Sequence, residues 1–195
     1  MSGIGSSPRR AALSAATIVG NAAVQAAAIA LAPRLPLDAL ALVLAALSGA
    51  AILGSTVILW GLALRRAVRR TLMVVAPAAL ATVIVAVAAP YLLPLVIALV
   101  SPVIAGDGLG RAWSLARRRP WSTIAALLLT VVAVLLATVV AMLLGLLLPG
   151  PLGAAAAWLV TGAGAVALIG VWARLAHAIA DPARDRPGPS AHPQP

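Results

Sequence analysis

Apolar residues along this chain occur in long uninterrupted runs rather than in the short alternating patterns of a soluble fold. A hydrocarbon core of about 30 Å requires roughly 20 apolar residues in a helix. Runs of about this length recur, separated by short segments rich in arginine, proline or glycine. We therefore predict an all-α, polytopic transmembrane helical bundle with spans over residues 11–31, 37–64, 71–89, 91–105, 121–148 and 154–173.

The first run is the weakest span, because it is rich in alanine and contains Asn21 and Gln25. Arg9 and Arg10 precede it, and residues 30–32 resemble a cleavage site, so a signal peptide is the alternative. The length of the run and Pro33, directly after that site, favour a retained helix.

Residues 71–105 form one uncharged stretch that is interrupted by prolines. Two crossings, 71–89 and 91–105, keep both ends of the stretch on the same side of the membrane. The second crossing is only about 22 Å long at 1.5 Å per residue. A hairpin that does not reach the far side is the alternative, and its irregular backbone would need shielding by protein or water.

Charge is scarce and one-sided, which sets the orientation. Only 9% of the 195 residues are charged and the net charge is +10, whereas soluble domains carry about 25% charged residues. All basic side chains are arginines, a bias typical of high-GC bacterial genomes. With the N-terminus in the cytoplasm and six crossings, every arginine except Arg34 lies on the cytoplasmic side. We expect a multi-pass protein of the bacterial cell membrane with both termini inside, with anionic lipid rather than nucleic acid as its partner.

The aromatic residues fit this orientation as interface anchors. Trp60, Trp121 and Trp172 fall at the predicted cytoplasmic ends of spans, and Tyr91 and Trp158 near the outer ends. Amphipathic rings prefer the headgroup region.

The segment between the fourth and fifth spans predicts a short amphipathic helix over residues 108–119, with Asp107 as its N-cap. Its apolar face consists of Leu109, Ala112, Trp113 and Ala116, and its polar face of Arg111, Ser114 and Arg118. Such a helix lies in the membrane interface. Two interpretations remain: a loop that only sets topology, or a lipid-headgroup or partner contact made by Arg111, Trp113, Arg117, Arg118 and Arg119.

The sequence from Arg111 to Trp121, RAWSLARRRPW, follows an apolar stretch with prolines and a glycine-rich acidic turn. Two strong spans come after it. This arrangement resembles the membrane domain of some bacterial glycerophosphodiester phosphodiesterases and the related stand-alone actinobacterial membrane proteins. That family usually has an acidic residue, often Glu, farther before the string, and only Asp107 can match it here. The resemblance implies a helical bundle and transfers no catalytic residue.

A polar stripe runs along the first span, formed by Ser14, Thr17, Asn21 and Gln25. At 100° per residue these side chains fall within about 80° of one another. They either bond neighbouring helices or line an aqueous or substrate path.

Candidate chemistry is sparse. There is no cysteine, lysine or glutamate, and His177 and Asp181 form only a weak pair at the end of the last span. We predict no catalytic residue, cofactor or metal. Residues 181–195 are rich in proline and predict a disordered cytoplasmic tail. The favoured function is a non-enzymatic scaffold or accessory subunit that engages anionic lipid or a membrane-protein partner. The alternatives are a transporter or channel component with a path along the first span, and an enzyme in which a partner completes Asp107 or His177.

Overall fold

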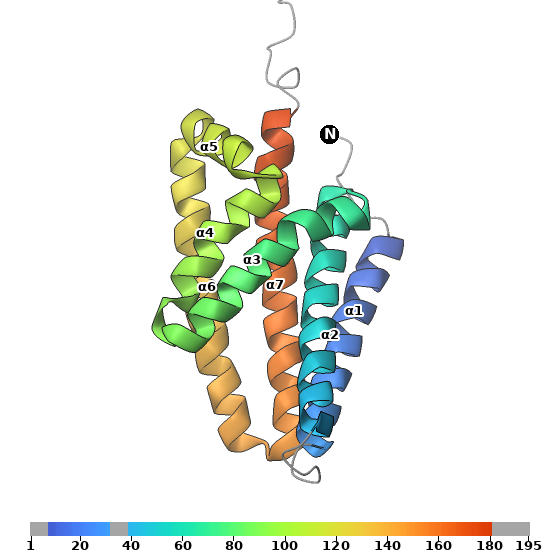
Figure 1. The fold of residues 1–195 in the computed structure, drawn as a ribbon. Helices are drawn as coiled ribbons and strands as arrows, with labels where there is room; N and C mark the ends of the chain where they lie inside the picture. The colour runs from blue at the N-terminus through green and yellow to red at the C-terminus, as the bar shows by residue number, and fades with distance from the viewer. Residues whose placement is uncertain (1–7, 32–38, 181–195) are drawn as a thin grey trace, which may run out of the picture.

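The structure is a computed structural model that describes residues 8–31 and 39–180. It is an all-α bundle, as predicted (Figure 1). Its elements are α1 (Pro8–Leu31), α2 (Ala39–Leu64), α3 (Val68–Ala88), the 3₁₀ turn η2 (Pro90–Leu92), α4 (Leu93–Gly106), α5 (Leu109–Arg118), α6 (Pro120–Leu147) and α7 (Gly150–Ala180). The predicted tail, 181–195, lies outside the described residues.

Five of the described helices, α1, α2, α3, α6 and α7, are long and apolar enough to cross a membrane. The chain is therefore a multi-pass membrane protein by the length and composition of its helices. α7 packs against both α1 and α6, and α2 packs against α1 and α3. α1 begins and α7 ends at the same end of the bundle (Figure 1).

α3, η2 and α4 form a hairpin that ends short of the opposite end of the bundle. In Figure 1 the η2 turn lies above the connection between α6 and α7. α4 has 14 residues, which is about 21 Å of helix and too short to cross a membrane alone. The arrangement agrees with the hairpin alternative for residues 71–105, since η2 stops within the length of the longer helices.

Proline positions explain the form of this hairpin. Pro90 begins η2, and Pro94 occupies the first turn of α4, where a missing N–H costs nothing. Pro77 and Pro102 lie inside α3 and α4, and membrane bundles tolerate such prolines where neighbouring groups shield the freed carbonyls.

The connection between α6 and α7 is shorter than the sequence suggested. The predicted spans 121–148 and 154–173 leave residues 149–153, with two prolines and two glycines, as the turn between them, but α7 begins at Gly150 and includes Pro151 in its first turn. That part of the prediction was wrong because proline is compatible with the start of a helix. Gly153 is required here, since an added Cβ would lie 2.3 Å from the carbonyl oxygen of Leu148.

The buried core lies at one end of the bundle. It joins the last turns of α2 to the first turns of α3 and α6 and to the second half of α7, and its members include Trp60, Leu64, Val75, Ala126 and Trp172. The buried residues of α6 are confined to its first half, Thr123, Ala126 and Thr130. The rest of α6 extends past the α3–α4 hairpin (Figure 1), and most of its large side chains are exposed, among them Leu135, Leu136, Met142 and Leu146.

Candidate functional site

Every described arginine belongs to a segment at the same end of the bundle, which we call the arginine end (Figure 1). These segments are the start of α1, the α2–α3 connection with the first turn of α3, α5 with its link to α6, and the last turns of α7. Its members are Arg9, Arg10, Arg65, Arg66, Arg69, Arg70, Arg111, Arg117, Arg118, Arg119 and Arg174. Asp107 is the one carboxylate residue among the described residues, and it lies at this end too.

Two helices that end here do so with the same motif. After α2, Arg65 has φ 55° and the N–H of Arg66 donates to the carbonyl of Gly61 at 3.1 Å. After α4, Asp107 has φ 62° and the N–H of Gly108 donates to the carbonyl of Val103 at 2.9 Å. Both are Schellman endings, in which the left-handed position is usually glycine. A charged residue occupies that position in each case.

Asp107 is surrounded by three guanidinium groups. Nε of Arg70 donates to its Oδ2 at 2.8 Å, and Nη2 of Arg70 contacts the same oxygen. Nη1 of Arg111 lies 3.6 Å from Oδ2, and Nη1 of Arg66 lies 3.8 Å from Oδ1. The Asp107 side chain is only 8% exposed. This carboxylate therefore links the α2–α3 connection to α5.

The side chain of Arg66 also caps the C-terminal end of α4. Its Nη1 donates to the carbonyl of Ile104 at 2.9 Å and its Nη2 to that of Ala105 at 2.8 Å. A cation at a helix C-terminus is favourable, since the last carbonyls have no partner within the helix. Desolvation by burial lowers the pKa of Arg66, and the charge of Asp107 opposes this shift. The guanidinium stays protonated at any physiological pH.

The predicted role of Asp107 as N-cap of the interfacial helix was wrong. Gly108 occupies the N-cap position of α5, and the structure shows no side-chain capping bond there. The left-handed backbone places Asp107 with the end of α4 instead, and its carboxylate is held by the arginines.

α5 meets α4 at an angle of 98°. Gly106 permits this bend, because a Cβ there would lie 2.8 Å from the backbone nitrogen of Ala112. α5 rests on the bundle through Leu115, which is buried and was not assigned to the apolar face from the sequence. Leu109 and Trp113 are 77% and 71% exposed. The expected apolar face of α5 therefore does not pack on the bundle as a unit, because its large side chains, Leu109 and Trp113, point away from it.

The other predicted contact residues take different positions. Arg117 and Arg118 are exposed, and no ion pair is found for either among the part of the chain that the structure describes. Arg111 is exposed but pairs with Asp107. Arg119 is half-buried between α5 and α6, and its carbonyl accepts from the hydroxyl of Thr123 at 2.9 Å. Of the predicted contact residues, Arg117, Arg118 and Trp113 are therefore the ones whose side chains are exposed and available to lipid or to a partner.

Two tryptophans are not interface anchors. Trp60 and Trp172 are buried in the core, and the indole Nε1 of Trp172 donates to the hydroxyl of Thr130 at 3.0 Å. The expectation was wrong for these two because the protein itself covers the arginine end of α2 and α7. Trp121 and Tyr91 are strongly exposed.

The polar stripe of α1 faces its neighbours. Gln25 is buried, donates to the carbonyl of Ser48 at 3.2 Å and accepts from the hydroxyl of that residue at 2.6 Å. Its Nε2 also lies 3.4 Å from Oδ1 of Asn21. Ser14 and Thr17 are partly exposed, and the hydroxyl of Thr17 bonds to its own helix. The contacts of Gln25 join α1 to α2.

A small cavity of about 80 Å³ lies between α1, α2 and α7 beside this stripe. Its polar lining includes Asn21, Ser55, Thr56 and Thr161. The three hydroxyl groups donate to carbonyls of their own helices. Trp158, expected near the outer interface, also lines this cavity.

Sequence reasoning missed the partners of Asp107. It treated Arg66 and Arg70 only as orientation signals, although an acidic residue between two glycines, near a run of arginines, is a usable sign of an ion-pair cluster. Among the described residues no group of three potential metal ligands is present. Asp181, the predicted partner of His177, lies outside them.

Comparison of the chain with models of known protein families, with curated proteins and with solved structures gives no match. The likeness to the phosphodiesterase membrane domain therefore rests on the segment around residues 111–121 and stays a prediction.

Proposed function

We propose that this chain is a non-enzymatic integral membrane protein, a scaffold or accessory subunit, that engages anionic lipid at its arginine end through α5. We place that end, with both termini, on the cytoplasmic side of a bacterial cell membrane. The observation that carries the proposal is the geometry of α5. It turns 98° from α4 and exposes Leu109 and Trp113 next to Arg117 and Arg118, for which no ion pair is found among the described residues.

Such a helix matches the interface between acyl chains and headgroups. Exposed Leu109 and Trp113 suit the acyl boundary, and guanidinium groups bind phosphate in a bidentate manner. Each arginine near an anionic surface contributes about 1 kcal/mol, which decays within a Debye length. The other exposed arginines of this end set the orientation, because positive segments stay inside during insertion.

The test replaces the two free arginines of α5, as Arg117→Gln with Arg118→Gln. Arg111 is left unchanged because it pairs with Asp107, and Arg119 because it is half-buried. Binding of phosphatidylglycerol to the purified protein in detergent micelles should weaken about 30-fold, since about 2 kcal/mol is lost. Binding of phosphatidylcholine should not change.

The matched control is Arg9→Gln with Arg69→Gln, which removes the same charge at the same end from two exposed positions outside α5. A loss as large in the control as in the α5 variant would show that only net charge matters. The topology-setting interpretation of this segment would then replace the proposal.

A transporter or channel component is the second candidate, and one observation favours it. The cavity beside the polar stripe lies between α1, α2 and α7 and has four polar lining residues. Filling it by Ala165→Leu, at another lining residue, would block a path there. Solute flux into vesicles that contain the wild type, together with its loss in this variant, would support the second candidate.

A further inference from the structure

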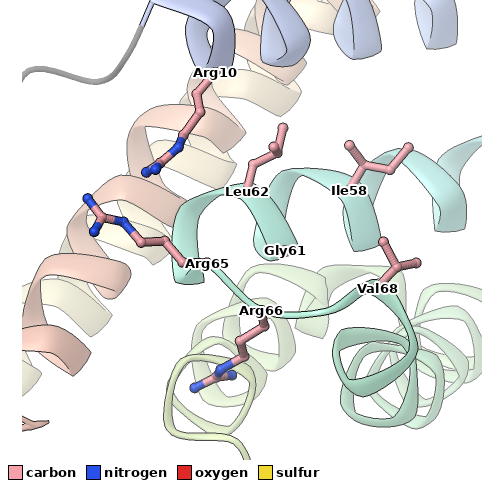
Figure 2. Close-up of a pocket in the computed structure, with 7 residues that line it drawn as sticks. All are labelled: Arg10, Ile58, Gly61, Leu62, Arg65, Arg66 and Val68. Carbon is pink, nitrogen blue, oxygen red and sulfur yellow. The ribbon is translucent and has the colours of Figure 1, made fainter.

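A second cavity, of about 290 Å³, lies at the arginine end where the start of α1 meets the α2–α3 connection. Its lining joins Arg10 of α1 and Arg65 to the apolar side chains of Ile58, Leu62 and Val68. Figure 2 shows Arg10 and Arg65 extending toward one another, while the side chain of Arg66 points to the opposite side, toward α4. The cavity is separate from α5.

The two arginines have no counter-charge in the described structure. Asp107 is the one carboxylate residue within 8–31 and 39–180, and it is surrounded by Arg66, Arg70 and Arg111. No ion pair of Arg10 or Arg65 is found in those ranges. Two cations that line one cavity repel each other, so an anion between them would be favourable.

The backbone of Arg65 adds an independent observation. Its φ of 55° is left-handed, which costs a residue with a Cβ about 1–2 kcal/mol and which glycine adopts freely. The equivalent charged residue after α4, Asp107, is explained by its arginine partners. No such partner of Arg65 is found within residues 8–31 and 39–180. Strained backbone positions cluster at ligand-binding sites.

We propose that this cavity binds a phosphate ester anion, the headgroup phosphate of a membrane lipid, between the guanidinium groups of Arg10 and Arg65. Planar guanidinium groups recognise phosphate oxygens in a bidentate manner. Ile58 and Val68 are 41% and 60% exposed and form an apolar side for the first part of an acyl chain. The volume is at the lower end of small-molecule pockets, roughly 300–1,000 Å³, and suits a single headgroup.

The experiment measures binding of phosphatidylglycerol to the purified full chain by native mass spectrometry. Arg10→Gln and Arg65→Gln should each weaken binding about fivefold. Arg69→Gln is the matched control, because Arg69 is an exposed neighbour outside the cavity. Arg65→Gly should weaken binding as much as Arg65→Gln while the melting temperature stays equal or rises, which a purely structural role of Arg65 would not produce.

Ile58→Trp and excess inorganic phosphate distinguish lipid from free phosphate. A lipid site predicts that Ile58→Trp, which fills the cavity, lowers phosphatidylglycerol binding, and that inorganic phosphate competes weakly. Strong competition by inorganic phosphate, with lipid binding unaffected by Ile58→Trp, would overturn the lipid assignment. Equal effects of Arg10→Gln, Arg65→Gln and Arg69→Gln would overturn the site itself. The α5 variant tests the proposed function separately, since it leaves this cavity intact.

Discussion

Replacing Asp107 by asparagine removes the negative charge that the arginines of this end share, and so measures its contribution to stability. Asparagine is nearly isosteric with aspartate and tolerates the left-handed backbone that Asp107 adopts, so the turn between α4 and α5 can keep its geometry. What changes is electrostatic. Arg66, Arg70 and Arg111 lose their shared counter-charge and repel one another.

The magnitude follows from the exposure of each partner. Breaking a buried ion pair costs about 3–5 kcal/mol, whereas an exposed pair contributes about 0–1 kcal/mol. Arg66 is 18% exposed, but Arg70 and Arg111 are 59% and 68% exposed and their contributions are screened by water. We expect Asp107→Asn to lower the free energy of unfolding by about 2–3 kcal/mol, mostly through Arg66.

The assay is SDS-induced unfolding in mixed micelles, followed by tryptophan fluorescence, because Trp60 and Trp172 belong to the buried core beside this cluster. A double-mutant cycle adds Arg66→Gln to both backgrounds. Arg66→Gln should destabilise the wild type more than it destabilises Asp107→Asn, where only its bonds to the carbonyls of α4 are lost. Equal costs in both backgrounds, or an Asp107→Asn protein as stable as the wild type, would refute the reasoning.

Two further predictions concern packing and topology. Gly162→Ala should destabilise the bundle by about 1–3 kcal/mol, because the new Cβ would lie 2.6 Å from a methyl carbon of Ile18, whereas Gly164→Ala, with nothing within 4 Å, should be neutral in the same unfolding assay. Reporter fusions after Arg70 should read cytoplasmic and those after Gly150 external, since the arginines lie at the opposite end from the α6–α7 connection; a cytoplasmic signal at Gly150 would contradict the orientation.

The helices could be predicted from the sequence because the condition for crossing a lipid bilayer depends only on the length and polarity of each local segment. A run of about 20 apolar residues is long enough to cross a membrane as a helix. Each predicted span corresponds to a helix, and the bounds agree within four residues except at the end of α7, which extends to Ala180 instead of residue 173. The α5 segment was also visible, since Gly108 and the arginine pattern delimit it. Proline at the start of α7 was misjudged because turn and first-turn prolines look alike in sequence.

The arrangement around Asp107 could not be predicted, because it depends on contacts between segments about 40 residues apart in the chain. Local rules assigned Asp107 to the helix that follows it, whereas the conformation of its own backbone assigns it to the helix before. The environment of Trp172 could not be predicted for the same reason, because its indole donates to Thr130 of another helix. Periodicity indicates which side of a helix is apolar, but it does not indicate whether lipid or protein will cover it.

The packing of α1 against α7 determines the order in which contacts form while the protein is synthesised. Ile18 of α1 lies where a Cβ of Gly162 in α7 would be, so α1 docks on a helix that leaves the ribosome after α2 to α6. The bond between Gln25 and Ser48 needs only α1 and α2, and it can form as soon as the second helix enters the bilayer. That early bond can hold the least apolar helix in the membrane while the remainder of the chain is translated. A variant without Ser48 would therefore lose α1 during synthesis more readily than from the finished bundle.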